Sequence, residues 1–127
     1  MIEKLTPEQA AAYFCHPSQV KASGMGGDLP DWMEYRTYGG VCGAFQPHLW
    51  PGIWMGHLAA LPEARGHAVK PMRAILAAFC NEVGAERIIG WVKENNRAAL
   101  ALCRRAGFET DGVLPLAEPV VMIGWKQ

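Results

Sequence analysis

The sequence lacks a hydrophobic run long enough to cross a bilayer. Its longest unbroken apolar stretch, residues 74–80, is far shorter than the roughly 18 to 20 residues that a membrane-spanning helix needs. The chain begins Met-Ile-Glu-Lys, without the apolar segment and small-residue cleavage site of a secretory signal. From these two absences we expect a cytoplasmic protein that does not enter a membrane.

An excess of charge of one sign is also lacking, because 12 Lys and Arg balance 12 Asp and Glu. Proteins that depend on nucleic-acid phosphates usually carry a clear basic excess, so we expect no nucleic-acid partner. Half of the residues are hydrophobic, which is enough for a buried core, and 127 residues correspond to one domain. We therefore predict a single domain over residues 1–127.

Closely spaced metal ligands are absent as well. The four cysteines stand at positions 15, 42, 80 and 103, and no two of them form Cys-x-x-Cys. The four histidines, at positions 16, 48, 57 and 67, show neither His-x-His nor His-x-x-x-His spacing. We expect free, buried thiols and no metal site.

What the sequence does contain is an alternation of helix and strand signals. Thr6 and Gln9 match a capping box around a proline at the first helical position. Apolar residues recur at steps of three and four over 69–83, and a glycine follows as C-cap. Such signals predict helices at 7–14, 17–21, 69–83 and 97–106, strands at 32–38, 41–45, 53–61, 87–92, 108–114 and 120–125, and a glycine-rich lid or connector at 23–30. The predicted fold class is α/β, with a mixed, mostly antiparallel sheet flanked by helices.

The stretch with the clearest chemistry is the sharp turn that joins the strand at 53–61 to the helix at 69–83. Gly66 and Ala68 stand where a larger side chain would fill the space of a ligand, beside the unpaired amides of a helix N-terminus. Such a turn can hold a diphosphate. The Gly-Lys-Ser/Thr motif of nucleotide triphosphatases is absent, which disfavours magnesium-dependent triphosphate chemistry.

At this turn the chain resembles the GNAT superfamily of acyl-CoA-dependent N-acyltransferases. Residues 62–68, Pro-Glu-Ala-Arg-Gly-His-Ala, are similar to that family's Pro-Glu-Tyr-Arg-Gly-Lys-Gly. Residues 96–108 resemble its Asn-x-x-Ala-x-x-Leu-Tyr-x-x-x-Gly-Phe. The order of predicted elements from residue 32 to residue 125 is also similar to the family's, whereas the short first 31 residues resemble small phage-encoded or prophage members.

The resemblance implies acetyl-CoA as the cofactor and an amine as the second substrate. It implies that amides at the helix start hold the diphosphate, that the preceding strand pairs with the pantetheine arm, and that the helix at 97–106 flanks the thiol. The implied residues are Ala59, Ala60 and Leu61 on the strand, Arg65, Gly66, His67, Ala68, Val69 and Lys70 at the turn, and Asn96 and Ala99 at the thiol end. Two departures from the family are Pro71, which has no amide proton, and Cys103, which stands in place of a tyrosine general acid.

Transfer of an acyl group to an amine needs a group that accepts a proton. His57 is the first candidate, because it lies on the strand that leads into the turn and an imidazole titrates near 6.5. A packing role for His57 stays open, and the carboxylate of Glu34 is the second candidate for the base. Cys103 is a candidate proton donor to the leaving thiolate, but we favour the alternative that it only fills the space of the missing ring.

Together these patterns predict an acetyl-CoA-dependent N-acetyltransferase in which the amine attacks directly in a ternary complex. One alternative is a catalytically weak or inactive CoA-binding interaction module, and another is an unrelated α/β ligand-binding domain. The identity of the acceptor, a small molecule or a protein, is left open. The loops contain no acidic cluster that would indicate an aminoglycoside or a polyamine. A monomer and a homodimer are both compatible with the sequence.

Overall fold

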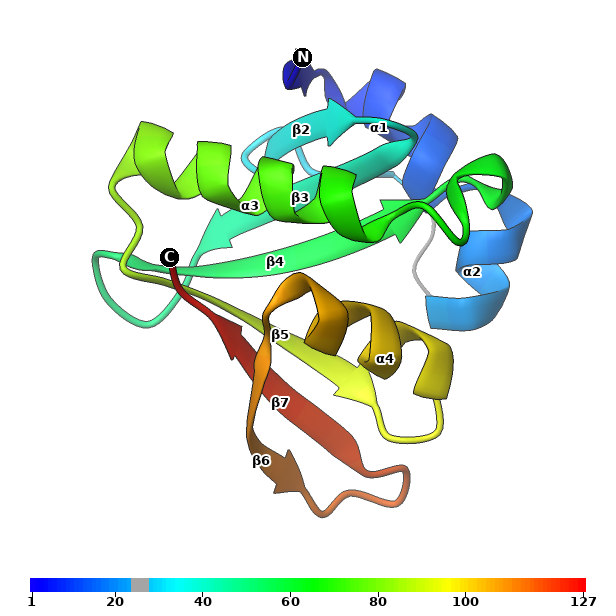
Figure 1. Ribbon diagram of the computed structural model, residues 1–127, viewed down its shortest axis with the longest axis vertical. Helices are drawn as coiled ribbons and strands as arrows, with labels where there is room; N and C mark the ends of the chain where they lie inside the picture. Colours follow the sequence, from blue (N-terminus) through cyan, green and yellow to red (C-terminus); the bar gives the residue numbers. More distant parts are fainter. Residues whose placement is uncertain (24–27) are drawn as a thin grey trace.

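A seven-stranded sheet organises the structure, a computed structural model that describes residues 1–23 and 28–127 (Figure 1). The helices are α1 (Pro7–Phe14), α2 (Pro17–Ser23), α3 (Val69–Val83) and α4 (Arg97–Ala106), with a short 3₁₀ helix η1 (Pro62–Ala64). The strands are β1 (Glu3–Leu5), β2 (Glu34–Tyr38), β3 (Val41–Pro47), β4 (Ile53–Ala60), β5 (Arg87–Lys93), β6 (Glu109–Leu114) and β7 (Val120–Trp125). Their order is β1-β2-β3-β4-β5-β7-β6, and only β4 and β5 pair in parallel. The predicted fold class is confirmed.

Local sequence signals explain most of the element boundaries. The hydroxyl of Thr6 accepts a hydrogen bond from the amide of Gln9, whose side chain accepts one from the amide of Thr6, so the capping box that begins α1 is formed. Gly39 and Gly40 both have positive φ, as a two-residue hairpin turn between β2 and β3 requires. The glycine-rich segment 24–27, part of the predicted lid or connector, lies outside the described residues.

Two features differ from the sequence patterns. The patterns do not predict β1, a strand of three residues that pairs antiparallel with β2. They also place the start of the first predicted strand at Trp32, whereas β2 begins at Glu34 and Trp32 is exposed. Both differences concern short segments, in which period-two alternation has too few residues to be recognised.

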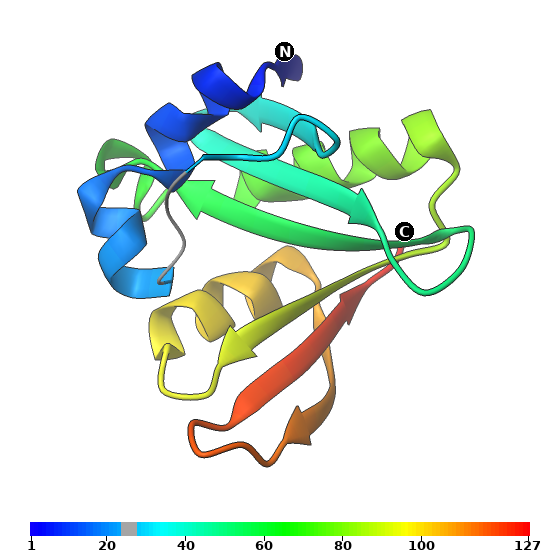
Figure 2. The same ribbon diagram turned by 180° about the vertical axis from the view of Figure 1, so that it is seen from behind.

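Helices cover both faces of the sheet. Figure 1 shows α3 and α4 in front of the strands, and Figure 2, from behind, shows α1 and α2 on the other face. The larger core lies under α3 and α4 and includes Phe45, Phe79 and Ile88, whereas a smaller core lies under α1 and includes Phe14 and Ala59. In the described ranges no helix is long and apolar enough to cross a membrane.

The sheet opens between its two central strands. The parallel pairing of β4 with β5 covers three residue pairs and ends at Met55 opposite Ile89, although β4 continues to Ala60 and β5 to Lys93. Figure 1 shows the ends of the two strands diverging, with the start of α4 beside the opening. The backbone at the end of β4 therefore faces a gap on the β5 side.

Candidate active site

The register of β4 determines which of its backbone groups face this gap. The amide of Leu61 donates to the carbonyl of Gly40 at 3.0 Å, and the amide of His48 donates to the carbonyl of Ile53 at 3.0 Å. Because antiparallel strands alternate hydrogen-bonded and non-bonded pairs, the odd-numbered residues of β4 direct their backbone groups to β3. The even-numbered ones direct theirs to the β5 side, so the free backbone of Leu58 and Ala60 faces the gap.

This register corrects part of the prediction for the pantetheine arm. The backbone of Ala59 and of Leu61 is engaged with β3, and the side chain of Ala59 is buried against α1. Of the three predicted strand residues, only Ala60 turns its backbone toward the gap. The backbone of Leu58, which the prediction omits, also faces the gap.

A cleft of about 330 Å³ occupies the gap. Residues that alternate along a strand face opposite sides of the sheet, so the cleft has two sides. The side near α4 is formed by Gly56, Leu58, Gly90, Val92, Asn96, Ala99, Cys103, Phe108 and Ile123, and the side near α2 by Gln19, His57, Trp91, Lys93 and Val120. The cleft thus lies between two central strands and is lined by residues from both faces of the sheet.

The predicted thiol-end residues Asn96 and Ala99 both line the α4 side of the cleft. Asn96 is the N-cap of α4, and its side-chain oxygen accepts a hydrogen bond from the amide of Ala99 at 3.2 Å. This bond fixes the start of α4 beside the opening. The structure therefore brings these two residues and Cys103 together at the cleft.

The turn before α3 forms a cradle of unpaired amides. His67 donates its amide to Ala64, but in the described part of the chain the amides of Ala68, Val69 and Lys70 find no acceptor. No side chain caps this 15-residue helix, so no side chain of the chain itself neutralises the positive end of its dipole. An anion with several oxygens can accept hydrogen bonds from these amides.

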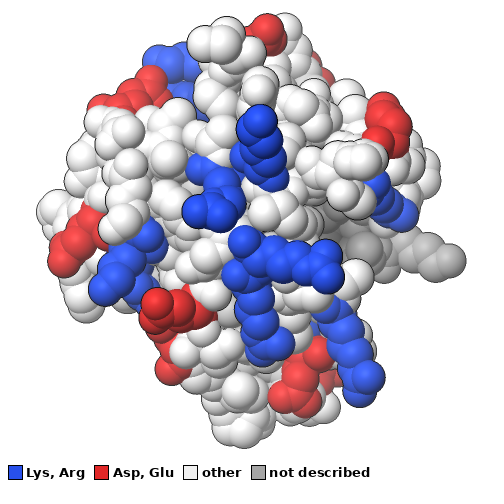
Figure 3. Space-filling model, in the orientation of Figure 1, with Lys and Arg blue, Asp and Glu red and all other residues white. Residues whose placement is uncertain are grey.

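Gly66 shapes the cradle. Its φ of +88° is unfavourable for other residues, and a Cβ built there would meet no atom within 4 Å. The space beside Gly66 in this turn is therefore open. The side chains of Arg65 and His67 are exposed on either side of Gly66. Lys and Arg side chains also gather over α3 and α4 on this face of the molecule (Figure 3), and Arg73, Arg104 and Arg105 are among the exposed ones.

His57 lies on the α2 side of the cleft, opposite the α4 side that holds Cys103. The imidazole is half-buried, and burial lowers the pKa of His57 below its usual value of 6.5. In the described ranges no protein group hydrogen-bonds to its ring. His57 is therefore neutral at pH 7 and has a ring nitrogen available to accept a proton.

Cys103 belongs to α4 and is buried in the larger core. Burial raises the pKa of the Cys103 thiol to about 11. A thiol with this pKa is a poor proton donor to a leaving thiolate, whose conjugate acid has a pKa near 8.5. The structure thus favours the interpretation that Cys103 fills space.

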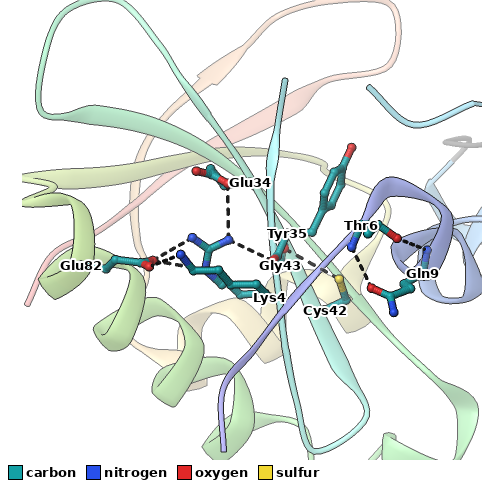
Figure 4. A network of polar contacts seen from close by, with 9 residues as sticks. Lys4, Thr6, Gln9, Glu34, Tyr35, Cys42, Gly43 and Glu82 are labelled. Carbon is teal, nitrogen blue, oxygen red and sulfur yellow. Dashed lines mark hydrogen bonds and ion pairs between the residues drawn. The ribbon is translucent and has the colours of Figure 1, made fainter. Parts of the chain in front are cut away.

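The structure does not bring Glu34 to the cleft, so its prediction as a second base is corrected. Glu34 shares a face of β2 with Arg36, under α3, and its carboxylate lies 3.5 Å from the Arg36 guanidinium. His57 lies on the other face of the sheet, as the register of the strands and the alternation of side chains along each strand require. Figure 4 shows Glu34 with Lys4 and Glu82 in this separate network.

Sequence reasoning missed Trp91 and Lys93, which line the cleft beside His57. The run at 87–92 resembles a strand buried on both faces, but only the even-numbered Ile88 and Gly90 are fully buried. The signal that could have identified the two residues is the alternation of Trp91 and Lys93 at the end of the strand. In the described ranges no three His, Cys, Asp or Glu side chains gather as a metal site would require.

Comparison with known proteins identifies the fold. No family model and no curated sequence matches the chain. The aminoglycoside acetyltransferase AAC(6′)-Ib in complex with coenzyme A superposes with a TM-score of 0.75 at 15% identity, over 100% of this chain and 94% of that chain. The GNAT-family acetyltransferase from Bacillus anthracis superposes with a TM-score of 0.71 at 14% identity, over 98% of this chain and 93% of that chain. The fold is that of the GNAT acetyltransferases.

The ribosomal-protein-S5-alanine acetyltransferase from Vibrio fischeri has the same GNAT fold. It superposes with a TM-score of 0.74 at 10% identity, over 98% of this chain and 91% of that chain. These structures share the GNAT fold with the present chain although few of their residues are identical to it. The resemblance seen in the two sequence motifs therefore extends to the whole fold.

Proposed function

We propose that this protein is an acetyl-CoA-dependent N-acetyltransferase. The observation that carries the proposal is the succession along the chain of the open β4–β5 gap at the end of β4 and the uncapped N-terminus of α3. A long cofactor with an anionic diphosphate and a peptide-like arm matches this path, because one end offers free amides and the other offers unpaired strand backbone. A structure of AAC(6′)-Ib with acetyl-CoA, which has the same fold, supports this choice.

Each part of the path has residues suited to one part of the cofactor. The amides of Ala68, Val69 and Lys70 would hold the diphosphate, and the carbonyl of Leu58 and the backbone of Ala60 would pair with the pantetheine arm. Asn96 and Ala99 would stand beside the thiol end. When bound, acetyl-CoA supplies a thioester carbonyl that an amine can attack.

The chain's own residues then have two tasks. A ring nitrogen of His57 accepts the proton that the amine loses as its nitrogen bonds to the carbonyl carbon and the carbon–sulfur bond breaks. The amide of Leu58 faces the gap near His57 and would donate to the carbonyl oxygen as negative charge develops on it. The leaving thiolate takes its proton from water, because the raised pKa of Cys103 makes that thiol a weak donor.

Cofactor binding is tested with two variants at Gly66. Gly66→Glu and Gly66→Gln impose the same backbone strain at a positive φ and have similar size, but only Glu adds a charge in front of the amides. We expect Gly66→Glu to bind CoA at least tenfold more weakly than Gly66→Gln in calorimetry. Equal affinities of the two variants would contradict binding of the diphosphate in this cradle.

Turnover is tested separately by measuring thiol release from acetyl-CoA with a panel of amines. Product formation that depends on the amine identifies a transferase. CoA binding without any amine-dependent thiol release would instead identify the inactive CoA-binding module. His57→Gln gives the matched variant for this assay.

A further inference from the structure

The α2 side of the cleft is where the acceptor would meet the cofactor, and its charge is informative. Among the described residues that line the cleft there is no Asp or Glu, and Lys93 is the lining residue with a permanent charge. A site for polycations such as polyamines needs carboxylates, because each buried ammonium group must be paired. The lining thus disfavours a polycationic acceptor.

Lys93 is held by a contact that an acceptor can replace. Its ammonium lies 3.3 Å from the carboxylate of Glu118, and the two side chains are 51% and 68% exposed. An exposed pair of this kind contributes little to stability, so an anionic group of a ligand can exchange with Glu118 at small cost. The amide of Glu94 donates to the carbonyl of Pro119 at 2.9 Å, which keeps the loop of Glu118 beside the end of β5.

Trp91 adds an apolar wall beside Lys93. The two residues are two positions apart in β5, so their side chains lie on the same face of the sheet. Trp91 is 55% exposed although it is a large aromatic residue. Across the cleft from them stands His57. A neutral base, a cation and an aromatic surface therefore meet in one cleft of about 330 Å³, which also has to admit the thioester.

On the basis of the proposed function, we infer that the acceptor is a small amine that carries a carboxylate near the reacting nitrogen, as amino acids do. Lys93 binds the carboxylate, Trp91 contacts the apolar part, and the amine is directed to His57. Lys93 acts on binding rather than on proton transfer. Its effect should therefore appear in KM and not in kcat.

The test compares amino acids with their own carboxamides, which differ in the carboxylate alone at that position. For the best amino acid we expect Lys93→Gln to raise KM about tenfold, as loss of a charge-assisted hydrogen bond does, with kcat nearly unchanged. For the carboxamide the same variant should change KM by less than about twofold. Comparing the ratio of the two substrates between wild type and Lys93→Gln cancels the different pKa values of their amines.

Two further variants complete the design. Lys93→Arg should restore most of the preference for the amino acid, and Glu118→Gln should leave it unchanged or increase it, because a competing carboxylate is removed. Efficient transfer to spermidine, or an amino acid to carboxamide ratio that Lys93→Gln does not change, would overturn this inference and leave the transferase proposal intact. Absence of transfer to every amine would instead overturn the proposed function, and this inference with it.

Discussion

At the scale of single residues, His57 is proposed as the base because its imidazole lines the cleft and burial lowers its pKa. Replacing it by glutamine keeps a similar shape but removes the group that titrates. We expect His57→Gln to lower kcat/KM by roughly 10²- to 10⁴-fold while CoA affinity stays the same. Thiol release and calorimetry measure the two quantities.

The pH dependence distinguishes His57 from the substrate amine. Because burial lowers the pKa of His57, wild-type activity should fall only as the pH drops below 6.5, where the ring becomes protonated. An amine with a pKa near 9 to 10 titrates at higher pH, and its limb should move when an acceptor of different pKa is used. If the low-pH limb survives in His57→Gln, the base is another group.

The same pKa shift predicts an effect on stability. A histidine whose pKa is lowered by folding binds its proton more readily in the unfolded chain, so the native state loses stability as the pH falls below 6.5. Above that pH the term is constant. The Tm of the wild type should therefore fall more steeply than that of His57→Gln between pH 7 and pH 5, as measured by thermal unfolding. Parallel curves for the two proteins would show that His57 titrates normally.

Cys103 is expected to be dispensable for the chemistry. Cys103→Ala removes one buried sulfur and should cost about 1 kcal/mol of unfolding free energy, while transfer stays within about tenfold of the wild type. Thermal unfolding and thiol release give the two values. A variant that binds CoA normally but loses transfer by several orders of magnitude would make Cys103 the acid.

Some of the site residues follow from the sequence and others do not, for a physical reason. His57, Asn96 and Cys103 lie on motifs or next to them, and the structure places all three at the cleft. The direction of the amides in β4 depends on the pairing of Leu61 with Gly40, a contact between residues far apart in sequence. No local pattern contains that information, so the sequence could not show whether Ala59 or its neighbours direct their backbone groups toward the gap.

At the scale of elements, a charged network joins the sheet to α3 (Figure 4). Arg36 on β2 is 4% exposed and donates to Glu82 on α3 at 2.8 Å, and Lys4 on β1 lies 3.0 Å from the same carboxylate. We expect Glu82→Gln to lower the unfolding free energy by about 1 to 2 kcal/mol, because a buried guanidinium loses its main anionic partner. This value is below that of a fully buried pair, since Glu82 is 38% exposed.

The acid dependence of stability checks this assignment. The hydrogen bonds from Arg36, and then those from Lys4, lower the pKa of Glu82 below 4.5. Glu82 therefore stabilises the fold above pH 4.5, and its contribution is lost as the pH falls further. The gap in Tm between wild type and Glu82→Gln should narrow below pH 4.5. Glu109→Gln, at an exposed carboxylate, is the control, and its Tm should equal that of the wild type both above and below pH 4.5.

An element is predicted more accurately from the sequence when it is long and has clear start and end signals. α3 carries 15 residues with a regular apolar period and a glycine C-cap in the left-handed conformation, and its predicted limits agree with the structure. β1 has three residues and is held by pairing with β2 and by the ion pair of Lys4 with Glu82. Such a strand depends on tertiary contacts, which are absent from its own sequence.

At the scale of the whole molecule, two halves of one sheet meet at β4 and β5 over three residue pairs. The larger core, which includes residues from both halves, holds them together under α3 and α4. A ligand in the gap would add contacts to the strand ends that lack a partner. Binding should therefore change the protection of particular amides rather than the shape of the domain.

CoA is expected to stabilise the domain and to protect two separate groups of amides. At a concentration 100 times its Kd, a ligand that binds only the native state adds about 2.7 kcal/mol, so Tm should rise by several degrees. In hydrogen exchange, the added protection should concentrate at Ala60 and at the start of α3, at 68–70, because these amides face the gap or the cradle. Amides between β2 and β3 are already paired and should change little. At the same CoA concentration Gly66→Glu, with its at least tenfold weaker affinity, should show about half of this stabilisation or less. Protection that is uniform over the chain would mean that CoA binds outside the gap.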